Sequence, residues 1–226
     1  MLFETRIPEE ERPLTKEFLE AYDRYSYQRR LRIEDFYETV VRDFQNGTLL
    51  EVNSGWGYTA IEIVKRSQSL NLVALVETDP VMDQARKKAL REGVTERMSL
   101  VKGQNQSMPF ESNSFEGVIS TNALHSWSSP SLIIREMVRV VKPGGMILMI
   151  DLRRDSDEVI VEYLVREMKK DQTPGGIYAL ETFVKAWRSS YVREEVEKIL
   201  KAAAICMFEI TQEGPMTRTI KIRKQE

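Results

Sequence analysis

The stretch Leu50-Glu-Val-Asn-Ser-Gly-Trp-Gly57 joins an apolar run to a segment of helical periodicity. Residues 48–52 are predicted to form a short strand, and residues 59–66 carry apolar side chains at the spacing of a helix face. Glycines at 55 and 57 would let the backbone approach a ligand, and the first turn of the following helix offers unpaired N–H groups. This arrangement predicts a nucleotide-binding loop.

A carboxylate strengthens this prediction. Glu77 follows Gly57 by 20 residues, directly after the apolar run Leu72–Val76, which is expected to form a strand buried on both faces. In a doubly wound sheet, a carboxylate at this position accepts hydrogen bonds from ribose hydroxyls. Position 60 is Ala60, so the third glycine of the dinucleotide fingerprint is missing. A nicotinamide-dependent oxidoreductase is therefore the less favoured alternative.

Strand and helix patterns alternate along the chain from residue 48 onward. The spacing is that of βαβ units, and the last two predicted strands are joined as a hairpin through Glu213-Gly-Pro215. The expected fold is a Rossmann-like doubly wound α/β sheet of seven strands, mostly parallel with a C-terminal antiparallel hairpin. The remaining predicted strands span residues 98–102, 115–120, 146–151, 205–211 and 216–223, and the later predicted helices span residues 130–141, 157–170, 178–189 and 193–203.

Composition excludes several classes of protein. The chain has 226 residues and a formal net charge of −2, so one domain is expected and nucleic acid is not an expected partner. No apolar run reaches the roughly 18 residues of a membrane span, and a signal-peptide pattern is missing, so a cytoplasmic protein is expected. Cys206 is the single cysteine, which argues against disulfides and a thiolate metal site; its apolar neighbours predict a core position.

Residues Leu49 to Arg154 resemble the SAM (S-adenosylmethionine)-dependent methyltransferases of the small-molecule, methyltransferase-11-like type. The resemblance covers about half of the chain, in order and at family spacing. Its segments are Leu50–Gly57, Val76-Glu-Thr-Asp-Pro-Val-Met82, Gly103-Gln-Asn-Gln-Ser-Met-Pro-Phe110 with Asn113-Ser-Phe115, Ala123-Leu-His-Ser-Trp127, and Arg139-Val-Val-Lys-Pro-Gly-Gly145.

The resemblance implies SAM as the cofactor and methyl transfer to an unidentified small molecule as the reaction. It places Glu51 at the loop or the methionine amino group, Glu77 at the ribose hydroxyls and Thr121 beside the methionine portion. A protein or RNA acceptor stays open as an alternative. The cofactor contacts that it implies are Glu51, Asn53, Gly55, Gly57, Glu77, Thr78, Gln104, Asn105 and Thr121.

Two positions depart from the family pattern. Asn53 stands where the family has the first glycine of the loop, and Gln104 stands where an acidic residue is usual. Asparagine tolerates left-handed backbone better than other side chains do, and an amide accepts a hydrogen bond without carrying charge. These departures support an alternative function, a catalytically impaired protein of methyltransferase fold that serves as a binding or assembly module.

Candidate catalytic and substrate residues follow from position. His125 is the only histidine and follows the fourth predicted strand, where ligands bind in open α/β sheets, so it is the candidate general base. The alternative is that His125 and Trp127 only shape a pocket wall. The N-terminal residues Tyr22, Tyr25 and Arg30 are candidate substrate contacts from a lid, and the alternative is a plain packing helix. His125 and Trp127 are further candidate substrate contacts.

The expected organisation is a single methyltransferase domain with four parts. Residues 1–47 form an N-terminal helical lid, residues 48–154 the SAM-binding core, residues 155–190 a helical insertion, and residues 191–226 a C-terminal helix and hairpin. The insertion is expected to shape a substrate site or a homodimer contact, with Tyr178 and Trp187 as aromatic anchors. No metal site is expected.

Overall fold

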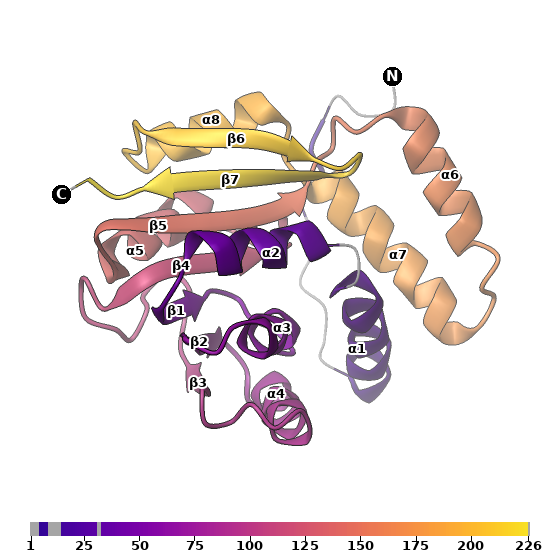
Figure 1. Cartoon of the computed structure of the whole chain (residues 1–226). Coiled ribbons are helices and arrows are strands. Elements are labelled where there is room, and N and C mark those ends of the chain that lie inside the picture. The colour runs from indigo at the N-terminus through magenta and orange to yellow at the C-terminus, as the bar shows by residue number, and fades with distance from the viewer. Residues whose placement is uncertain (1–4, 9–14, 31–32, 226) are drawn as a thin grey trace.

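The computed structural model describes residues 5–8, 15–30 and 33–225, and within this part a seven-stranded sheet is the centre of the fold. The strand order is β3-β2-β1-β4-β5-β7-β6, with β7 antiparallel to both of its neighbours and the other pairs parallel. The predicted Rossmann-like doubly wound sheet is confirmed (Figure 1). The strands are β1 (Gly47–Glu51), β2 (Leu70–Val76), β3 (Met98–Lys102), β4 (Phe115–Thr121), β5 (Val141–Leu152), β6 (Phe208–Glu213) and β7 (Thr217–Arg223).

The neighbouring strands β1 and β4 mark the point where the order of the sheet reverses. From β1 the chain proceeds to β2 and β3 on one side, whereas β4 leads to β5 on the other side. The loops that leave β1 and β4 therefore diverge, and a crevice forms outside their carboxyl ends. This topology places the loop after Glu51 and the turn after Thr121 at the same edge of the sheet.

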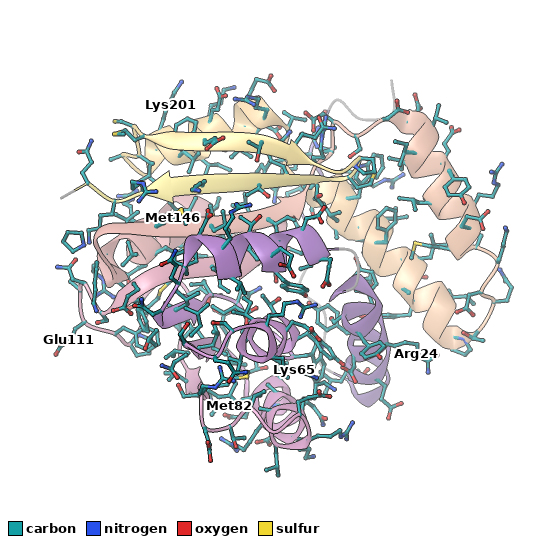
Figure 2. All side chains as sticks on the ribbon, in the orientation of Figure 1. Arg24, Lys65, Met82, Glu111, Met146 and Lys201 are labelled. Atoms are coloured by element: carbon teal, nitrogen blue, oxygen red, sulfur yellow. The ribbon has the colours of Figure 1, made fainter. Side chains whose placement is uncertain are left out.

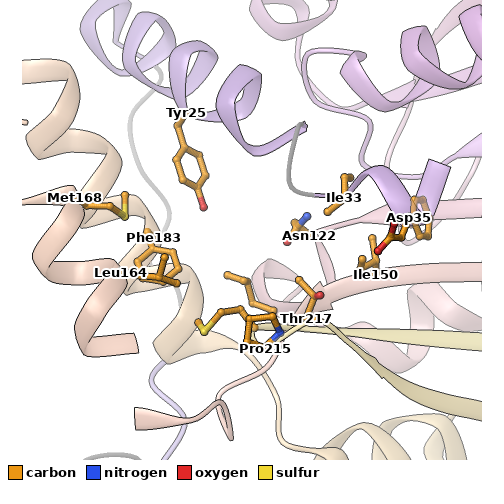
Figure 3. A pocket seen from close by; sticks show the side chains of 14 residues that line it. Tyr25, Ile33, Asp35, Asn122, Ile150, Leu164, Met168, Phe183, Pro215 and Thr217 are labelled. Atoms are coloured by element: carbon orange, nitrogen blue, oxygen red, sulfur yellow. The ribbon is translucent and has the colours of Figure 1, made fainter. Parts of the chain in front are cut away.

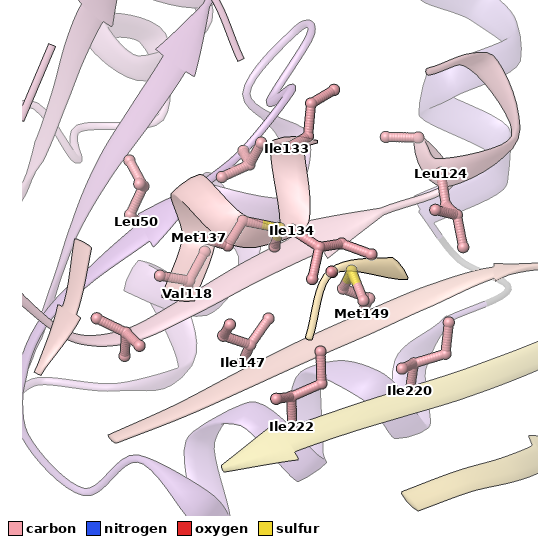
Figure 4. Close-up of a cluster of buried hydrophobic side chains, with 14 of the residues drawn as sticks. Leu50, Val118, Leu124, Ile133, Ile134, Met137, Ile147, Met149, Ile220 and Ile222 are labelled. Atoms are coloured by element: carbon pink, nitrogen blue, oxygen red, sulfur yellow. The ribbon is translucent and has the colours of Figure 1, made fainter. Parts of the chain in front are cut away.

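Two hydrophobic cores cover the two faces of the sheet. The α3-side core packs α2 (Glu34–Asp43), α3 (Tyr58–Arg66) and α4 (Asp79–Arg91) against one face. The α5-side core packs α5 (Pro130–Val140) and α8 (Arg193–Ala202) against the other face (Figures 1 and 4). Alternate strand residues enter opposite cores, as Leu49 and Leu50 do. Charged side chains such as Lys65 and Lys201 lie on the outside (Figure 2).

Helix α2 belongs to the sheet-covering layer. Its residues Phe36 and Val40 are fully buried in the α3-side core. The ring of Phe44, directly after the helix, lies so close to Gly117 of β4 that an added Cβ there would be 2.1 Å from it. The predicted N-terminal helical segment therefore contains two helices with different surroundings, because only α1 (Lys16–Arg30) lies away from the sheet, against α3 and α7.

A third hydrophobic cluster lies beyond the carboxyl end of the sheet. This α7 cluster joins α1, α6 (Glu158–Met168), α7 (Pro174–Ser189) and the start of β7. Its buried members are Tyr25, Val161, Ala179, Phe183, Trp187 and Met216. The segment predicted to be a helical insertion thus brings its own apolar surface to the carboxyl edge of the sheet.

The structure corrects three local predictions. Helix α7 begins at Pro174 and not near Tyr178, because the hydroxyl of Thr173 accepts from the N–H of Gly176 and caps a first turn that contains proline. Strand β5 begins at Val141, earlier than residue 146. The predicted core position of Cys206 is wrong: this residue is exposed in the connection after α8, before β6 begins.

None of the helices in the described part of the chain is both long enough and apolar enough to cross a membrane. Nor do the described residues contain a group of three or more histidine, cysteine, aspartate or glutamate side chains placed to hold a metal ion.

Candidate functional site

The carboxylate of Glu51 organises the loop that follows β1. Its side chain is 1% exposed, and its Oε2 accepts hydrogen bonds from the hydroxyl of Ser54 at 2.6 Å and from the N–H of Ala60 at 3.2 Å. These contacts join the loop to the first turn of α3, where helix N–H groups favour negative charge. Glu51 therefore fixes the conformation of the loop from its buried side.

Asn53 occupies the left-handed backbone region, with φ of 58°. A family glycine would adopt this conformation without strain, and asparagine is among the few other residues that do so readily. The side chain of Asn53 accepts a hydrogen bond from Nδ2 of Asn105 at 3.1 Å. The backbone N–H of Asn105 in turn donates to Glu77 at 3.2 Å. The loops after β1, β2 and β3 are thereby tied together.

The two glycines of the loop are required for different reasons. Gly55 has φ of +55°, lines a small cavity, and a Cβ added to it would meet nothing within 4 Å. Gly57 has φ of +75° at the start of α3, and a Cβ there would lie 2.8 Å from the side chain of Met98. Gly57 thus permits helix packing, whereas Gly55 leaves open space above the loop.

Buried polar atoms without hydrogen-bond partners in the described part of the chain lie in the loops at this edge of the sheet and in α1. The Oγ1 of Thr78 and the Oδ1 of Asn105 are buried, and no described residue hydrogen-bonds to them. Three more buried atoms lack a hydrogen-bond partner among the described residues: the Oγ of Ser26, the Nε1 of Trp56 and the Nδ2 of Asn122. Buried polar groups are nearly always paired in native proteins, so this series fits a polar ligand that extends along the edge of the sheet.

The loop after β3 is held by α5. The backbone N–H of Met108 donates to Glu136 at 2.8 Å, and Arg139 donates to the same carboxylate and to the carbonyl of Phe110. The hydrogen bond from Arg139 lowers the pKa of Glu136 below its usual value. Because the folded-state pKa is depressed, this contact stabilises the fold above about pH 4.5 and loses its contribution as the pH falls further. The segment that carries Gln104 and Asn105 is thus anchored near neutral pH.

Helix α1 lies over the loop after β1. The ring of Tyr22 is 6.1 Å from that of Trp56, and Asp23 accepts from the Tyr58 hydroxyl at 2.6 Å and from Lys88 at 2.9 Å. Between α1 and the loop is a cavity of about 20 Å³, room for about one water. Its lining includes Tyr22, Ser26, Asn53, Gly55, Trp56, Thr121 and Asn122.

Asn122 also lines a second, larger cavity of about 260 Å³. This cavity lies between α1, the α6–α7 pair, the end of β5 and the turn between β6 and β7. In Figure 3, Tyr25 points into it from α1, with Leu164 and Phe183 on one side and Asn122 on the other. The substrate candidates Tyr22 and Tyr25 therefore line different cavities, whereas the side chain of Arg30 lies outside the described part.

His125 and Trp127 line neither of these two cavities. His125 is 5% exposed, and its Nδ1 lies 2.7 Å from a carboxylate oxygen of Asp151, so this nitrogen donates to Asp151. The carbonyl of His125 accepts from Arg6 at 2.9 Å. Trp127 is buried in the α5-side core. These contacts make both residues part of the packing of the turn after β4, and neither of the two cavities supports the alternative in which they shape a pocket wall.

Replacing His125 by Ala is expected to lower the free energy of unfolding by about 1–3 kcal/mol, because the buried Asp151 loses a hydrogen-bond donor. Urea denaturation measures this loss. The affinity for S-adenosylhomocysteine, measured in parallel, should stay within twofold of the wild type. His125→Asn keeps an N–H donor near the position of Nδ1 and should recover part of the stability. Unchanged stability with impaired cofactor binding would contradict this assignment.

Sequence reasoning missed Ser26, Trp56 and Asn122 at the small cavity. Trp56 lies within the decisive loop and Asn122 directly follows Thr121, so position relative to the strand ends could have suggested both. Thr121 itself was predicted, and its hydroxyl lies 3.0 Å from that of Thr59. Ser26 carries no such signal, because nothing in the sequence shows which face of α1 meets the loop.

Comparison with known proteins agrees with this geometry. Residues 50–149 match the family model of the methyltransferase domain. A 2-methyl-6-phytyl-1,4-hydroquinone methyltransferase of Oryza sativa subsp. japonica is 30% identical over 45% of this chain and 28% of its own length. A sterol 24-C-methyltransferase of Aspergillus fumigatus is 34% identical over 50% of this chain and 32% of its own length. The chain thus covers about a third of these relatives.

Solved structures show the same fold. A crystal structure from Methanococcus maripaludis matches with a TM-score of 0.76 and 21% identity over 97% of this chain and 98% of its own. A SAM-dependent methyltransferase from Aquifex aeolicus matches with a TM-score of 0.63 and 18% identity over 83% of this chain and 88% of its own. Residues 50–149 of this chain thus match a methyltransferase domain, and the chain has the fold of these SAM-dependent methyltransferase structures. The prediction from the loop motifs is confirmed, and SAM is the cofactor of this class of domain.

Within the methyltransferase domain, the sequence-predicted cofactor residues gather at one edge of the sheet. Asn53 and Asn105 are hydrogen-bonded to each other, Glu77 accepts from the backbone N–H of Asn105, and Glu51 holds the loop of Asn53 through the hydroxyl of Ser54. Gln104 is exposed at this edge and forms an isolated bridge with Ser107.

Proposed function

We propose that this chain transfers the methyl group of SAM to a small-molecule acceptor. The observation that carries the proposal is the series of buried polar atoms that lack partners within the described residues. Four of them, on Trp56, Thr78, Asn105 and Asn122, follow the carboxyl ends of β1, β2, β3 and β4, and the fifth, on Ser26, belongs to α1. A ligand that carries polar groups at both ends and is narrow between them would provide hydrogen-bond partners for these atoms.

The residues of the crevice fit the parts of SAM. Thr78 and Asn105 offer hydrogen-bonding atoms for the adenine end, and the exposed carboxylate of Glu77 can accept from the ribose hydroxyls. The Nε1–H of Trp56 offers a donor for the carboxylate of the methionine end. Asn53 does not interfere with this arrangement, because its side chain is engaged by Asn105.

When bound, SAM supplies an electrophilic methyl group: an electron pair of the acceptor forms the new bond, the pair of the broken S–C bond stays on sulfur, and a proton leaves the acceptor for water. The chain contributes orientation and a dry site, which are the main requirements of such a displacement. Asn122 is common to the linings of both cavities, so the methyl group and the acceptor would meet beside it.

Helix α1 is proposed as a lid over the methionine end. The cavity beneath it, about 20 Å³, is too small for an amino-acid group, so Tyr22 or Ser26 has to move when the cofactor enters. The contacts of Asp23 with Tyr58 and Lys88 would then close the lid again. Water exclusion after closure would favour the transfer step.

The names of the relatives favour a small acceptor over a protein or an RNA. Two of them name a hydroquinone and a sterol as the molecule that is methylated. The formal net charge of −2 gives no support to an RNA acceptor.

Isothermal titration calorimetry of the whole chain tests the proposal. We expect SAM and S-adenosylhomocysteine to bind with dissociation constants in the range of about 1 µM to 1 mM, the range typical of enzyme ligands. NADH, titrated as the control nucleotide, should give no heat of binding. If neither SAM nor S-adenosylhomocysteine binds at millimolar concentration, the proposed function is wrong, and the alternative of a binding or assembly module takes its place.

A further inference from the structure

The cavity of about 260 Å³ has a lining that is mainly apolar. Leu164 and Met168 come from α6, Phe183 from α7, Ile150 from β5 and Met216 from the turn before β7. An engineered cavity of about 150 Å³ holds benzene. The larger volume here therefore suits a ring that carries substituents, or two fused rings.

The charges around this cavity restrict its ligand. Among the described residues that line it there is no lysine, arginine or histidine, and its single acidic residue is the exposed Asp35. An anionic ligand would lose its hydration and gain no cationic partner from these described residues, which is unfavourable in an apolar site. Asp35 would add repulsion at the rim. Carboxylates and phosphates are therefore disfavoured as ligands.

One polar group faces this apolar space from the cofactor side. Asn122 is 8% exposed, and its Nδ2 is buried with no hydrogen-bond partner in the described part of the chain. Its backbone N–H donates to the carbonyl of Ile150 at 2.7 Å, and its φ of 49° is left-handed. The residue is thus held firmly after β4. An unpaired N–H donor in this position calls for an oxygen on the ligand.

We propose that this cavity is the methyl-acceptor site and that the acceptor is an uncharged, mainly apolar ring compound with an oxygen that accepts from Asn122. The inference rests on the proposed function, because it assigns the acceptor to the cavity that shares Asn122 with the cofactor site. The shape and polarity of this cavity are determined mainly by α1, α6, α7 and the turn between β6 and β7. These elements lie outside the five parallel strands.

The test compares two probes of nearly equal size, 2-naphthol and 2-naphthoate, by calorimetry at pH 7 with and without saturating S-adenosylhomocysteine. We expect 2-naphthol to bind and 2-naphthoate to bind at least tenfold more weakly. In Leu164→Glu, which puts a carboxylate into the lining, 2-naphthol affinity should fall at least tenfold. Val159→Glu is the matched control, because Val159 lies on the same helix but is 73% exposed.

S-adenosylhomocysteine affinity is the readout that separates the two proposals. It should be unchanged in Leu164→Glu, which also shows that the variant folds. If that variant fails to fold, Met168→Trp, which fills the cavity without a charge, takes its place. Normal S-adenosylhomocysteine binding with no preference for 2-naphthol, or with no loss in the lining variant, overturns the acceptor site alone. Failure of S-adenosylhomocysteine to bind the wild type overturns the proposed function and, with it, the acceptor role, even if 2-naphthol binds.

Discussion

Replacing Gly55 by Ala is expected to weaken binding of S-adenosylhomocysteine at least tenfold while leaving the fold intact. A Cβ at this position meets no protein atom within 4 Å, so the methyl group projects into the space that the cofactor is proposed to occupy. The left-handed backbone at φ of +55° adds strain of about 1–2 kcal/mol, which a domain tolerates. Calorimetry measures the affinity, and urea denaturation measures the strain.

Gly93→Ala is the matched control for this substitution. Gly93 has φ of +69°, an added Cβ there also meets nothing within 4 Å, and it follows α4, away from the crevice. Both variants should therefore lose about the same 1–2 kcal/mol of stability. Only Gly55→Ala should lose cofactor affinity. Equal affinities in the two variants would show that the ligand does not lie against this loop.

Replacing Glu51 by Ala is expected to abolish measurable cofactor binding and to lower the free energy of unfolding by about 2–4 kcal/mol. The substitution leaves the Ser54 hydroxyl and the Ala60 N–H without their acceptor in a buried site, and each such loss costs about 1–3 kcal/mol. For a chain of this length, the midpoint of thermal unfolding should fall by roughly 5–15 °C. Thermal denaturation and calorimetry report the two effects separately.

Two variants control for the loss of a carboxylate. Glu96→Ala removes an exposed glutamate near the start of β3 and should change stability by less than about 0.5 kcal/mol. Glu51→Gln keeps an oxygen that can accept one hydrogen bond, so its stability should lie between those of Glu51→Ala and the wild type. If Glu51→Ala binds S-adenosylhomocysteine with wild-type affinity, the loop does not depend on this carboxylate for its binding conformation.

Both predictions concern one short segment, and its function depends on two separate properties. Glu51 determines the shape of the loop from inside the protein, whereas Gly55 keeps the outer surface of the loop clear. A stability loss without a binding loss, or the reverse, would therefore identify which property a given substitution changes. The departure at Asn53 disturbs neither property, since its backbone is left-handed as a glycine's can be and its side chain bonds to Asn105.

The proposed cofactor half of the site has a sequence signature, because its chemistry is encoded by contiguous residues at strand ends. The loop Glu51 to Gly57 combines a buried acceptor, a left-handed position and two glycines within seven residues. Each of these features is a local property of the backbone or of one side chain. Apolar runs that alternate with helical patterns likewise predict the strands and their parallel arrangement. A strand that is buried on both faces of a sheet has a continuous apolar sequence.

The acceptor half could not be predicted in this way. Its lining combines residues from distant parts of the chain, among them Tyr25, Asn122, Leu164, Phe183 and Met216. An apolar residue that lines a cavity has the same sequence pattern as one that fills a core, so periodicity cannot separate the two. Position in the sequence likewise made His125, the only histidine, a candidate base. In the fold its ring lies against Asp151.

The sequence by itself determined the fold class, the resemblance to a methyltransferase domain and the glycine-containing loop after β1, because these follow from short-range patterns of burial and backbone conformation. Only the tertiary structure decided which side of α1 covers that loop, that Asn122 stands between two cavities, and that the larger cavity is apolar and lacks cationic side chains among its described residues. Those properties arise where helices far apart in the chain pack together, and that packing depends on the whole fold.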